Sequence, residues 1–588
     1  MERRWQLDVA GRTSIRERAI RALGLFLVLL AAALPGNPQV SSPAAQSSVD
    51  SLDQLSARIK KLYSEGRWDE IAREGTIPSP TNADIDYCYG SALAHIGRLD
   101  DARRAFLVGR RLSPRDKRFP IELAGVAFRQ KRYPSAAVWL RRALRLDPNE
   151  AYANDFLGTV YFLQDNLDAT LKYWNRNAKP QIDTVRPDHP LHIRPALLDR
   201  ALTFSAASEL RLAELETSRA RVAGLDTFPA ARFQLAARPD GNFDVALNLQ
   251  ERNRWGSSVW EALLSTLGGV GYQTLYPAYF NVGGSAINVT SLVRWDAQKR
   301  RLEARLSGPL RENPKWRYRV GVDLRNENWD LRDAFAGPAP VLASLNLRRE
   351  AGGVEIDSFD SGRWGWSAGA EFSHRDYRSV VPAATLTPAL LTGPQLKQTA
   401  RTHSNLLRLP ERRLNIETSA SSQLARIWSQ PAHAFAKLQG GILAHWFPKA
   451  EGDDYEVLSQ LRAGGTIGQL PFDELYMLGM ERDNDLWMRA HIGTRDGRKG
   501  SAPLGQSYFL SNSEIDKNIY GNGLMTVKLG PFLDTGRITD PAQNLGSQKC
   551  LWDTGVEAKL RVLGVGVTFV YGKDLRTGNN AFYFTARP

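Results

Sequence analysis

From about residue 251 to the end of this 588-residue chain, apolar and polar residues alternate in short runs. Three runs show the pattern well, namely 316–325, 364–373 and 565–572. In each, one face is apolar with aromatics toward an end, and the other is mostly polar or small. Successive side chains of a β-strand point to opposite faces, so the pattern predicts strands with one apolar and one polar side. A membrane β-barrel and a soluble β-sandwich both satisfy it.

The N-terminus favours the barrel over the sandwich. Several arginines precede a short apolar run, 22–34, which Pro35 ends. A helix needs roughly 20 apolar residues to cross a bilayer, so this run is too short. The pattern predicts a secretory signal peptide over residues 1–46, with a buried apolar helix as the alternative. Arginine-rich strand faces also suit a wet barrel interior better than a dry sandwich core. Residues 253–588 would supply roughly 16 transmembrane strands.

Composition limits the remaining classes. The length exceeds that of one hydrophobic core and predicts two to four domains. A net charge of +14 suits an anionic membrane surface or nucleic acid, but no dense basic run selects nucleic acid, and none is expected as a partner. Cys88 and Cys550 lie too far apart in sequence for a metal-ligand spacing or a disulfide framework.

Residues 51–180 read as helices that repeat every 34 residues. Small residues let two helices approach, aromatics fill the gap, and prolines end the second helix of each pair. The repeat core positions are Gly90, Ala102, Phe106, Pro114, Ala136, Pro148, Gly158, Tyr161 and Trp174. The pattern resembles the tetratricopeptide family, whose arrays bind partners in a concave face or serve as spacers. Both roles stay open, with partner binding favoured.

Residues 181–252 read as a linker and a small α+β domain. Pro187–Pro195 is the predicted linker, and its prolines argue against a helical metal site at His189 and His192. A strand is expected at 201–205, a helix at 209–225 and a hairpin at 231–249 around an Asp-Gly turn. The layout resembles one polypeptide-transport-associated (POTRA) domain, and a generic α+β linker domain is the alternative.

Short motifs in the strand-rich half carry a more specific resemblance. They are Gly283–Ala286, Leu470–Gly479, Leu486–His491 and Phe532–Gly536. They resemble the bacterial surface-antigen superfamily, the outer-membrane barrels of protein assembly and secretion that follow POTRA domains. The resemblance implies that a long loop folds into the lumen, where Arg489 pairs with Glu514 and Asp534. Three unrelated surface charges are the alternative.

The loop motif comprises Met488, Ala490 and His491 beside the arginine, and the strand motif comprises Phe532 and Gly536. Ala490 and His491 depart from the family, which has glycine and an aromatic residue there. The chain also continues past its terminal aromatic as residues 585–588. These departures put the turn at the loop tip and the recognition of the last strand in question.

No sequence pattern for a hydrolase elbow, a zinc protease or a phosphate-binding loop occurs, so neither enzyme activity, cofactor nor metal is expected. The predicted fold is a helical repeat array, a POTRA-like domain and a transmembrane antiparallel barrel. We expect an outer-membrane protein with periplasmic N-terminal domains that inserts or translocates unfolded client polypeptides. Its expected partners are outer-membrane lipid, these clients and a periplasmic protein at the repeats. The alternatives are a passive pore or receptor and a soluble periplasmic scaffold with a β-sandwich.

Overall fold

The computed structural model describes residues 43–74, 82–332, 340–381, 389–449, 454–521, 525–541, 545–547, 549–562 and 565–587. Nearly all of the expected signal peptide, through residue 42, lies outside these ranges, so that expectation stays a prediction. The chain divides into two compact units, residues 1–114 and 115–588. Within the described ranges, no helix has the length and apolar character needed to cross a membrane.

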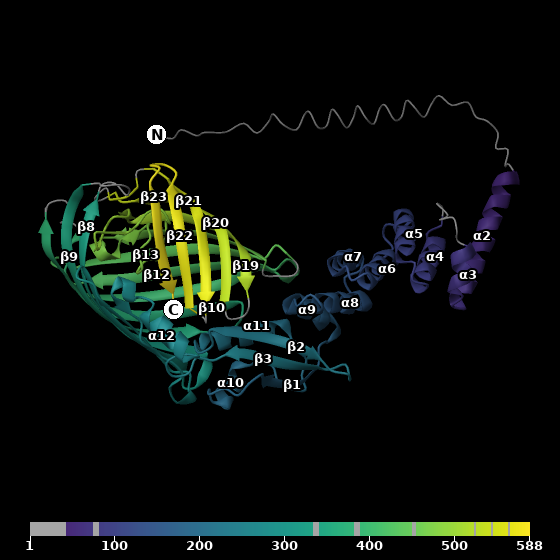
Figure 1. Cartoon of the computed structure of the whole chain (residues 1–588), viewed down its shortest axis with the longest axis horizontal. Helices are drawn as coiled ribbons and strands as arrows, with labels where there is room; N and C mark the ends of the chain where they lie inside the picture. Colours follow the sequence, from purple (N-terminus) through teal and green to yellow (C-terminus); the bar gives the residue numbers. More distant parts are fainter. Residues whose placement is uncertain are drawn as a thin grey trace, which may run out of the picture. The chain divides into compact units, whose positions relative to one another are not determined.

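The first unit is helical (Figure 1). Its helices are α2 (Pro43–Ser64), α3 (Trp68–Glu74), α4 (Ala83–His95) and α5 (Leu99–Leu112). Gly90 on α4 faces Phe106 on α5, and a β-carbon at this glycine would lie 2.6 Å from the ring. Ala102 is fully buried, and Pro114 follows the end of α5. The close approach of α4 and α5 therefore requires a residue without a side chain at position 90.

The second unit begins with four helices, and one pair of them also packs a glycine against an aromatic ring. They are α6 (Arg118–Arg129), α7 (Tyr133–Leu146), α8 (Ala151–Phe162) and α9 (Leu167–Trp174). Gly158 on α8 lies against the indole of Trp174 on α9, and Ala136 on α7 is fully buried. Tyr161 stacks on Tyr173 with ring centroids 5.8 Å apart. Pro148 follows the end of α7. The assignment of these helices to the tetratricopeptide family stays a prediction.

A small α+β domain follows. Its elements are β1 (Ile182–Pro187), α10 (Pro195–Ala201), α11 (Leu212–Gly224), β2 (Ala230–Ala237) and β3 (Phe243–Gln250). The strand order is β1-β3-β2, with β1 parallel and β2 antiparallel to β3. The hairpin of β2 and β3 and the helix α11 lie close to where the sequence predicts them. Both outer strands of this sheet are edge strands.

The strand predicted at 201–205 is wrong. The chain leaves α10 at Ala201 and continues without regular structure, while the first strand is β1, which ends where the predicted linker begins. Phe204 is buried against Phe233 on β2, with ring centroids 6.4 Å apart. Thr203 bonds through its hydroxyl to the carbonyl of Glu214 at 2.8 Å. The apolar residues that anchor this irregular segment to the core thus give it the alternating sequence pattern of a strand.

The rest of the chain forms one large antiparallel sheet (Figure 1). Before it stands α12 (Val259–Leu267), and the sheet begins with the short strands β4 (Thr274–Leu275) and β5 (Ala278–Tyr279). The next strands are β6 (Asn288–Trp295), β7 (Lys299–Leu310), β8 (Asn313–Arg332), β9 (Val341–Ser358), β10 (Trp364–Val381), β11 (Gly393–Leu409), β12 (Leu414–Ile427), β13 (His433–Trp446) and β14 (Tyr455–Gly468). The last ones are β19 (Ser507–Gly521), β20 (Met525–Thr539), β21 (Leu551–Val562), β22 (Val565–Asp574) and β23 (Asn580–Arg587).

Each strand pairs with the next from β6 to β14, then β14 pairs with β19, and the pairing continues to β23. Many strands are longer than the ten residues expected, and the predicted number of sixteen stays a prediction. The sheet curls until β23 and the β4–β5 edge are neighbours. We call this junction the seam. There the Tyr272 hydroxyl donates to the Phe584 carbonyl at 2.8 Å.

The strands alternate as predicted. On β8 the outward Val320, Val322 and Leu324 are exposed. The inward arginines on the same strand pair with carboxylates: Arg319 bonds to Asp357 on β9, and Arg325 bonds to Asp323 on its own strand. The sheet thus has an apolar outer face and a charged inner face.

The helix α9 is bound to the turn between β11 and β12. Asn166, which caps α9, donates to the carbonyl of Pro410 at 2.8 Å, and the Lys172 ammonium lies 2.6 Å from Glu411. Asp168 pairs with both Arg219 on α11 and Arg408 on β11, each at 2.5 Å. Burial raises the pKa of Asp168, but the two guanidinium groups outweigh it and lower the pKa below its ordinary value. One carboxylate therefore joins the last helix pair, the small domain and the sheet.

Candidate functional site

The segment 469–506, between β14 and β19, lies on the inner side of the sheet, and we call it the inner segment. It carries a short helix, η6 (Phe472–Glu474), and the short strands β15 (Tyr476–Met477), β16 (Thr494–Arg495), β17 (Arg498–Lys499) and β18 (Leu504–Gly505). Its side chains contact inward-facing residues from β6 to β22, far more of the wall than two adjacent strands offer. A segment that touches so much of a curled sheet must lie within the curl.

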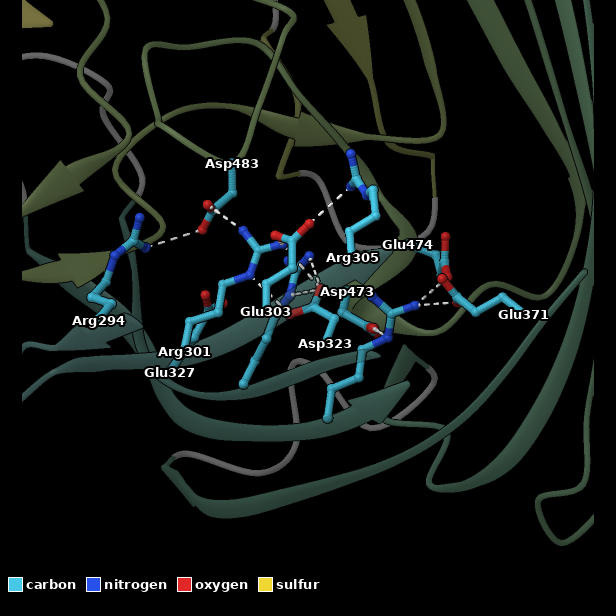
Figure 2. Close-up of polar contacts among 12 residues, drawn as sticks. Arg294, Arg301, Glu303, Arg305, Asp323, Glu327, Glu371, Asp473, Glu474 and Asp483 are labelled. Atoms are coloured by element: carbon cyan, nitrogen blue, oxygen red, sulfur yellow. Dashed lines mark hydrogen bonds and ion pairs between the residues drawn. The ribbon is translucent and has the colours of Figure 1, made fainter. Parts of the chain in front are cut away.

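The first anchor of the inner segment is acidic. Asp473 accepts a hydrogen bond from Tyr377 at 2.7 Å and lies 3.1 Å from the Arg375 guanidinium, both on β10. Glu474 lies 3.1 Å from the ammonium of Lys397 on β11 and accepts at its main-chain oxygen from Lys437 on β13 at 2.6 Å. Figure 2 shows both carboxylates near Glu371, which lies on β10. The neighbouring Phe472 is almost completely buried, so the anchor combines charge with packing.

The second anchor is Asp483. Its carboxylate lies 2.6 Å from Arg301 on β7 and 3.2 Å from Arg294 on β6 (Figure 2). It also lies 2.8 Å from Lys499 on the returning strand β17. The cations have further partners, because Arg301 also bonds to Asp323 at 2.8 Å. All these groups are largely shielded from water, and buried charges are tolerated when they are paired and hydrogen-bonded.

The third anchor is Arg489, whose side chain is 7 % exposed. Its guanidinium bonds to Asp534 on β20 through two nitrogens, at 2.7 and 2.9 Å. A third contact reaches Glu514 on β19 at 2.7 Å, and a fourth reaches Glu557 on β21 at 3.1 Å. The planar fork of arginine matches such multiple carboxylate contacts. The structure brings the three residues of the predicted latch together and adds Glu557.

The predicted motif residues surround this arginine. The Phe532 ring lies under the guanidinium, 4.0 Å from centroid to carbon, which is a cation–π distance. Met488 is fully buried in an apolar cluster with Leu478 and Leu510. A β-carbon at Gly536 would lie 3.0 Å from the main-chain oxygen of Phe509, so the neighbouring strands leave little room there.

Ala490 and His491, the two departures from the family pattern, bind the wall by other means. The Ala490 amide donates to Asp553 on β21 at 2.7 Å, and His491 Nδ1 lies 3.0 Å from the same carboxylate. His491 Nε2 lies 3.8 Å from Asp574 on β22. The three side chains offer ligand atoms within 4.8 Å of one another, which is compatible with a bound cation. Since both ring nitrogens face a carboxylate, direct contacts of the imidazole with Asp553 and Asp574 account for the same geometry.

Sequence reasoning missed much of this site. It did not mark the carboxylates Asp473, Glu474 and Asp483 as charged partners, nor the basic wall that receives them. The sequence did hold a signal for Glu557 and Asp553. Both lie on the same face of β21 as Lys559, and they alternate with outward residues. For the basic wall no local signal exists, because Asp483 and Arg301 are 182 residues apart in the chain.

Comparisons with known proteins give distant structural likenesses. No protein-family description and no curated protein matches the chain. Among solved structures, CdiB from Escherichia coli has a TM-score of 0.44 at 12% identity and covers 70% of this chain and 75% of that one. BamA from Haemophilus ducreyi lacking POTRA domains 1–3 has a TM-score of 0.40 at 10% identity, covering 69% and 84%. CdiB from Acinetobacter baumannii has 0.39 at 11%, covering 71% and 81%. Likenesses at this level do not assign an activity, which the chain's own residues must support.

Proposed function

We propose that this chain is an outer-membrane β-barrel protein that inserts or translocates polypeptides and has no enzymatic activity. In this proposal the outer face of the sheet contacts lipid, and the helical repeats and the small POTRA-like domain lie in the periplasm, where they recruit clients or a partner protein. The signal peptide expected at the N-terminus would deliver the chain there.

The inverted polarity of the sheet supports the membrane placement. Its outward side chains are apolar and exposed, whereas its inward side chains are charged and paired with one another. A protein dissolved in water would expose the charged face instead. Apolar-out and polar-in alternation is the arrangement that a lipid-embedded barrel requires.

The single observation that carries the proposal is the inner segment with its three anchors. It connects β6, β7, β10, β11, β19, β20 and β21 through buried ion pairs. A passive pore needs an open, solvated lumen, and a fixed internal segment narrows it. The arrangement around Arg489 also follows the order that the surface-antigen resemblance implies. These features favour a polypeptide-handling barrel over a passive pore.

The domains before the barrel offer binding surfaces for extended chains. The edge strands β1 and β2 of the small sheet can accept a further strand by main-chain hydrogen bonds. Exposed apolar side chains on the helices, among them Val138 and Tyr152, provide a second surface. Because Asp168 joins this region to β11, a bound polypeptide would be held next to the barrel. From there a client could enter through the seam, which would open sideways.

Membrane fractionation and gel mobility test the proposal. We expect the exported protein in the outer-membrane fraction, with a faster band in detergent before boiling than after it. A soluble protein with unchanged mobility would reject the barrel and leave the periplasmic scaffold. If the barrel is present, depletion of the protein should lower the level of client proteins in the membrane or medium. Solute conductance with unchanged client levels would instead identify a passive pore.

A further inference from the structure

The short helix α12 exposes apolar side chains and buries its charged one, the reverse of a surface helix in water. Val259, Trp260 and Leu263 are 82, 66 and 46 % exposed, and Leu264 and Leu267 are exposed too. Positions 260, 263, 264 and 267 fall on one helical face, because residues three and four apart are neighbours. An amphipathic helix on a soluble domain turns such a face toward the core. Here the apolar face points away from the protein.

The opposite face of α12 holds its single charged residue. The Glu261 side chain is 2 % exposed and lies 2.7 Å from Arg252. It also accepts a hydrogen bond from the Ser257 amide at 2.7 Å, and the Ser258 hydroxyl caps the helix by accepting from the Glu261 amide at 3.1 Å. The helix therefore presents no charge on its exposed side and neutralises the charge on its covered side.

The position of α12 is at the seam (Figure 1). The helix packs against β22 on one side of the junction and against β4 on the other. The Thr266 carbonyl accepts a hydrogen bond from the Tyr276 amide at 3.1 Å, which attaches the helix to the first strand segment. Just after α12, Tyr272 contacts Phe584 of β23 with ring centroids 5.1 Å apart. The helix and the turn after it thus connect both ends of the sheet.

The strands at the seam, where α12 lies, also carry exposed apolar side chains. Exposed apolar side chains nearby are Val289 on β6, Phe569 on β22, and Phe582 and Phe584 on β23. Before the helix, the exposed Trp255 packs edge-on against Tyr279, with centroids 5.3 Å apart. Tryptophan and tyrosine are enriched where a protein crosses from lipid to headgroups. The exposed side of α12 therefore has the same apolar character as the outer face of these strands.

We propose that α12 is a lipid-binding element that holds the seam together. The acyl chains of bilayer phospholipids cover its apolar face, and this contact keeps the helix across the two ends of the sheet. The inference rests on the proposed function, since it requires the barrel to be in a membrane. It adds that lipid at the seam, and not strand pairing alone, determines how readily the two ends separate.

Fluorescence quenching tests the lipid contact. In full-length protein carrying Cys550→Ser, with the buried Cys88 left in place, Leu264→Cys is labelled with a fluorophore and placed in phosphatidylcholine vesicles with brominated acyl chains. Val354→Cys, on the outer face of β9, is the lipid-facing reference, and Tyr152→Cys, on α8, is the water-facing reference. We expect the labels at 264 and 354 to lose fluorescence to a similar extent, and the label at 152 to keep it.

The outcomes separate the two proposals. Quenching at 354 without quenching at 264 would overturn the lipid contact of α12, since water or a partner protein would then cover it, and would leave the barrel intact. Absence of quenching at both positions would reject the membrane barrel and the inference with it.

A second measurement tests the role of α12 in closing the seam. Leu264→Asp places a charge on the lipid-facing side, and we expect faster amide hydrogen exchange in α12, β4 and β23 of the protein in vesicles. Val354→Asp places the same charge on the outer face away from the seam, and should not speed exchange in those elements. Unchanged exchange in α12, β4 and β23 of the Leu264→Asp protein would overturn the proposed role.

Discussion

The two sides of the barrel interior bind the inner segment with opposite charges. On β6 to β13 the wall offers cations to Asp473, Glu474 and Asp483, whereas on β19 to β22 it offers carboxylates to Arg489 and His491. A reversed segment would place like charges together, which is destabilising. The charge order along the segment therefore contributes to how the segment lies across the barrel, together with its apolar packing.

The two sides also differ in redundancy. Two of the three cations around Asp483 have other carboxylate partners: Arg301 has Asp323, and Lys499 has Glu327 at 2.7 Å. On the acidic side, the Arg489 guanidinium serves three carboxylates, of which Glu514 and Glu557 also pair with Lys559. Among the described residues, Arg489 is the only cationic partner of the fully buried Asp534, which it binds through two nitrogens, so its loss should be more harmful than the loss of Asp483.

The largest effect is expected for Arg489→Ala. Removing one partner from a buried ion pair costs about 3–5 kcal/mol, because the remaining charge stays buried without compensation. We expect the urea midpoint of unfolding in detergent, followed by the loss of heat-modifiable mobility, to fall accordingly. Arg489→Lys is the matched control, which keeps the charge but loses the fork, and should recover part of the loss. Unchanged midpoints for Arg489→Ala would show that the anchor contributes nothing to the barrel.

A smaller loss is expected for Asp483→Ala on the basic side. Two of the three cations it leaves, Arg301 and Lys499, retain carboxylate partners, so the cost should be about 1–3 kcal/mol, that of an unsatisfied buried group. The same urea titration measures it. Asp485→Ala is the control, because Asp485 lies two residues away with an 88 % exposed side chain, and it should change stability by less than about 0.5 kcal/mol. A cost for Asp483→Ala equal to that of Arg489→Ala would contradict the difference in redundancy.

The double variant Asp483→Ala and Arg489→Ala asks whether the two sides act through one segment. Residues in independent networks give additive effects within about 0.5 kcal/mol. We expect less than the sum of the single effects, because a segment released at one anchor is ordered less well at the other. Additivity in the same unfolding assay would instead indicate that each anchor stabilises only its own part of the wall.

The smallest effect is expected outside the interior, at Asp168, where the basic Arg408 at the end of β11 meets a more hydrated carboxylate. Asp168→Asn should reduce stability by about 1 kcal/mol, near the upper limit for partly exposed ion pairs. Because the pKa of Asp168 is lower in the folded protein, its contribution is present above the ordinary aspartate pKa and is lost as pH falls through the lowered value.

Unfolding midpoints at neutral pH and below pH 4 measure this dependence. The wild type should have the higher unfolding midpoint at neutral pH, and its difference from Asp168→Asn should become smaller at the lower pH. Asp199→Asn, at an exposed position on α10, serves as the control and should behave like the wild type at both values. If the difference in unfolding midpoint between the wild type and Asp168→Asn became larger at acid pH, the lowered pKa of Asp168 would be contradicted.

The sequence allowed the helices, the hairpin of the small domain and the alternating strands to be predicted, because each follows from a local period. Arg489, Glu514 and Asp534 were placed together through the resemblance of short motifs. The anchors at Glu474 and Asp483 were not, since their partners depend on how the sheet curls, which no local pattern records. The false strand at 201–205 has the opposite cause: Phe204 alternates like a strand residue but packs from an irregular segment.

The order of the partners along the chain has a consequence for biosynthesis. The wall residues that bind Asp473, Glu474 and Asp483 from the strands all precede the inner segment, so they leave the ribosome before it. The wall residues that bind Arg489 and His491 all follow it. The acidic residues of the segment thus have their partners on earlier strands, whereas Arg489 has its carboxylate partners only on β19 to β21. A chain truncated before β19 would therefore keep Arg489 but lack all three carboxylates that bind it.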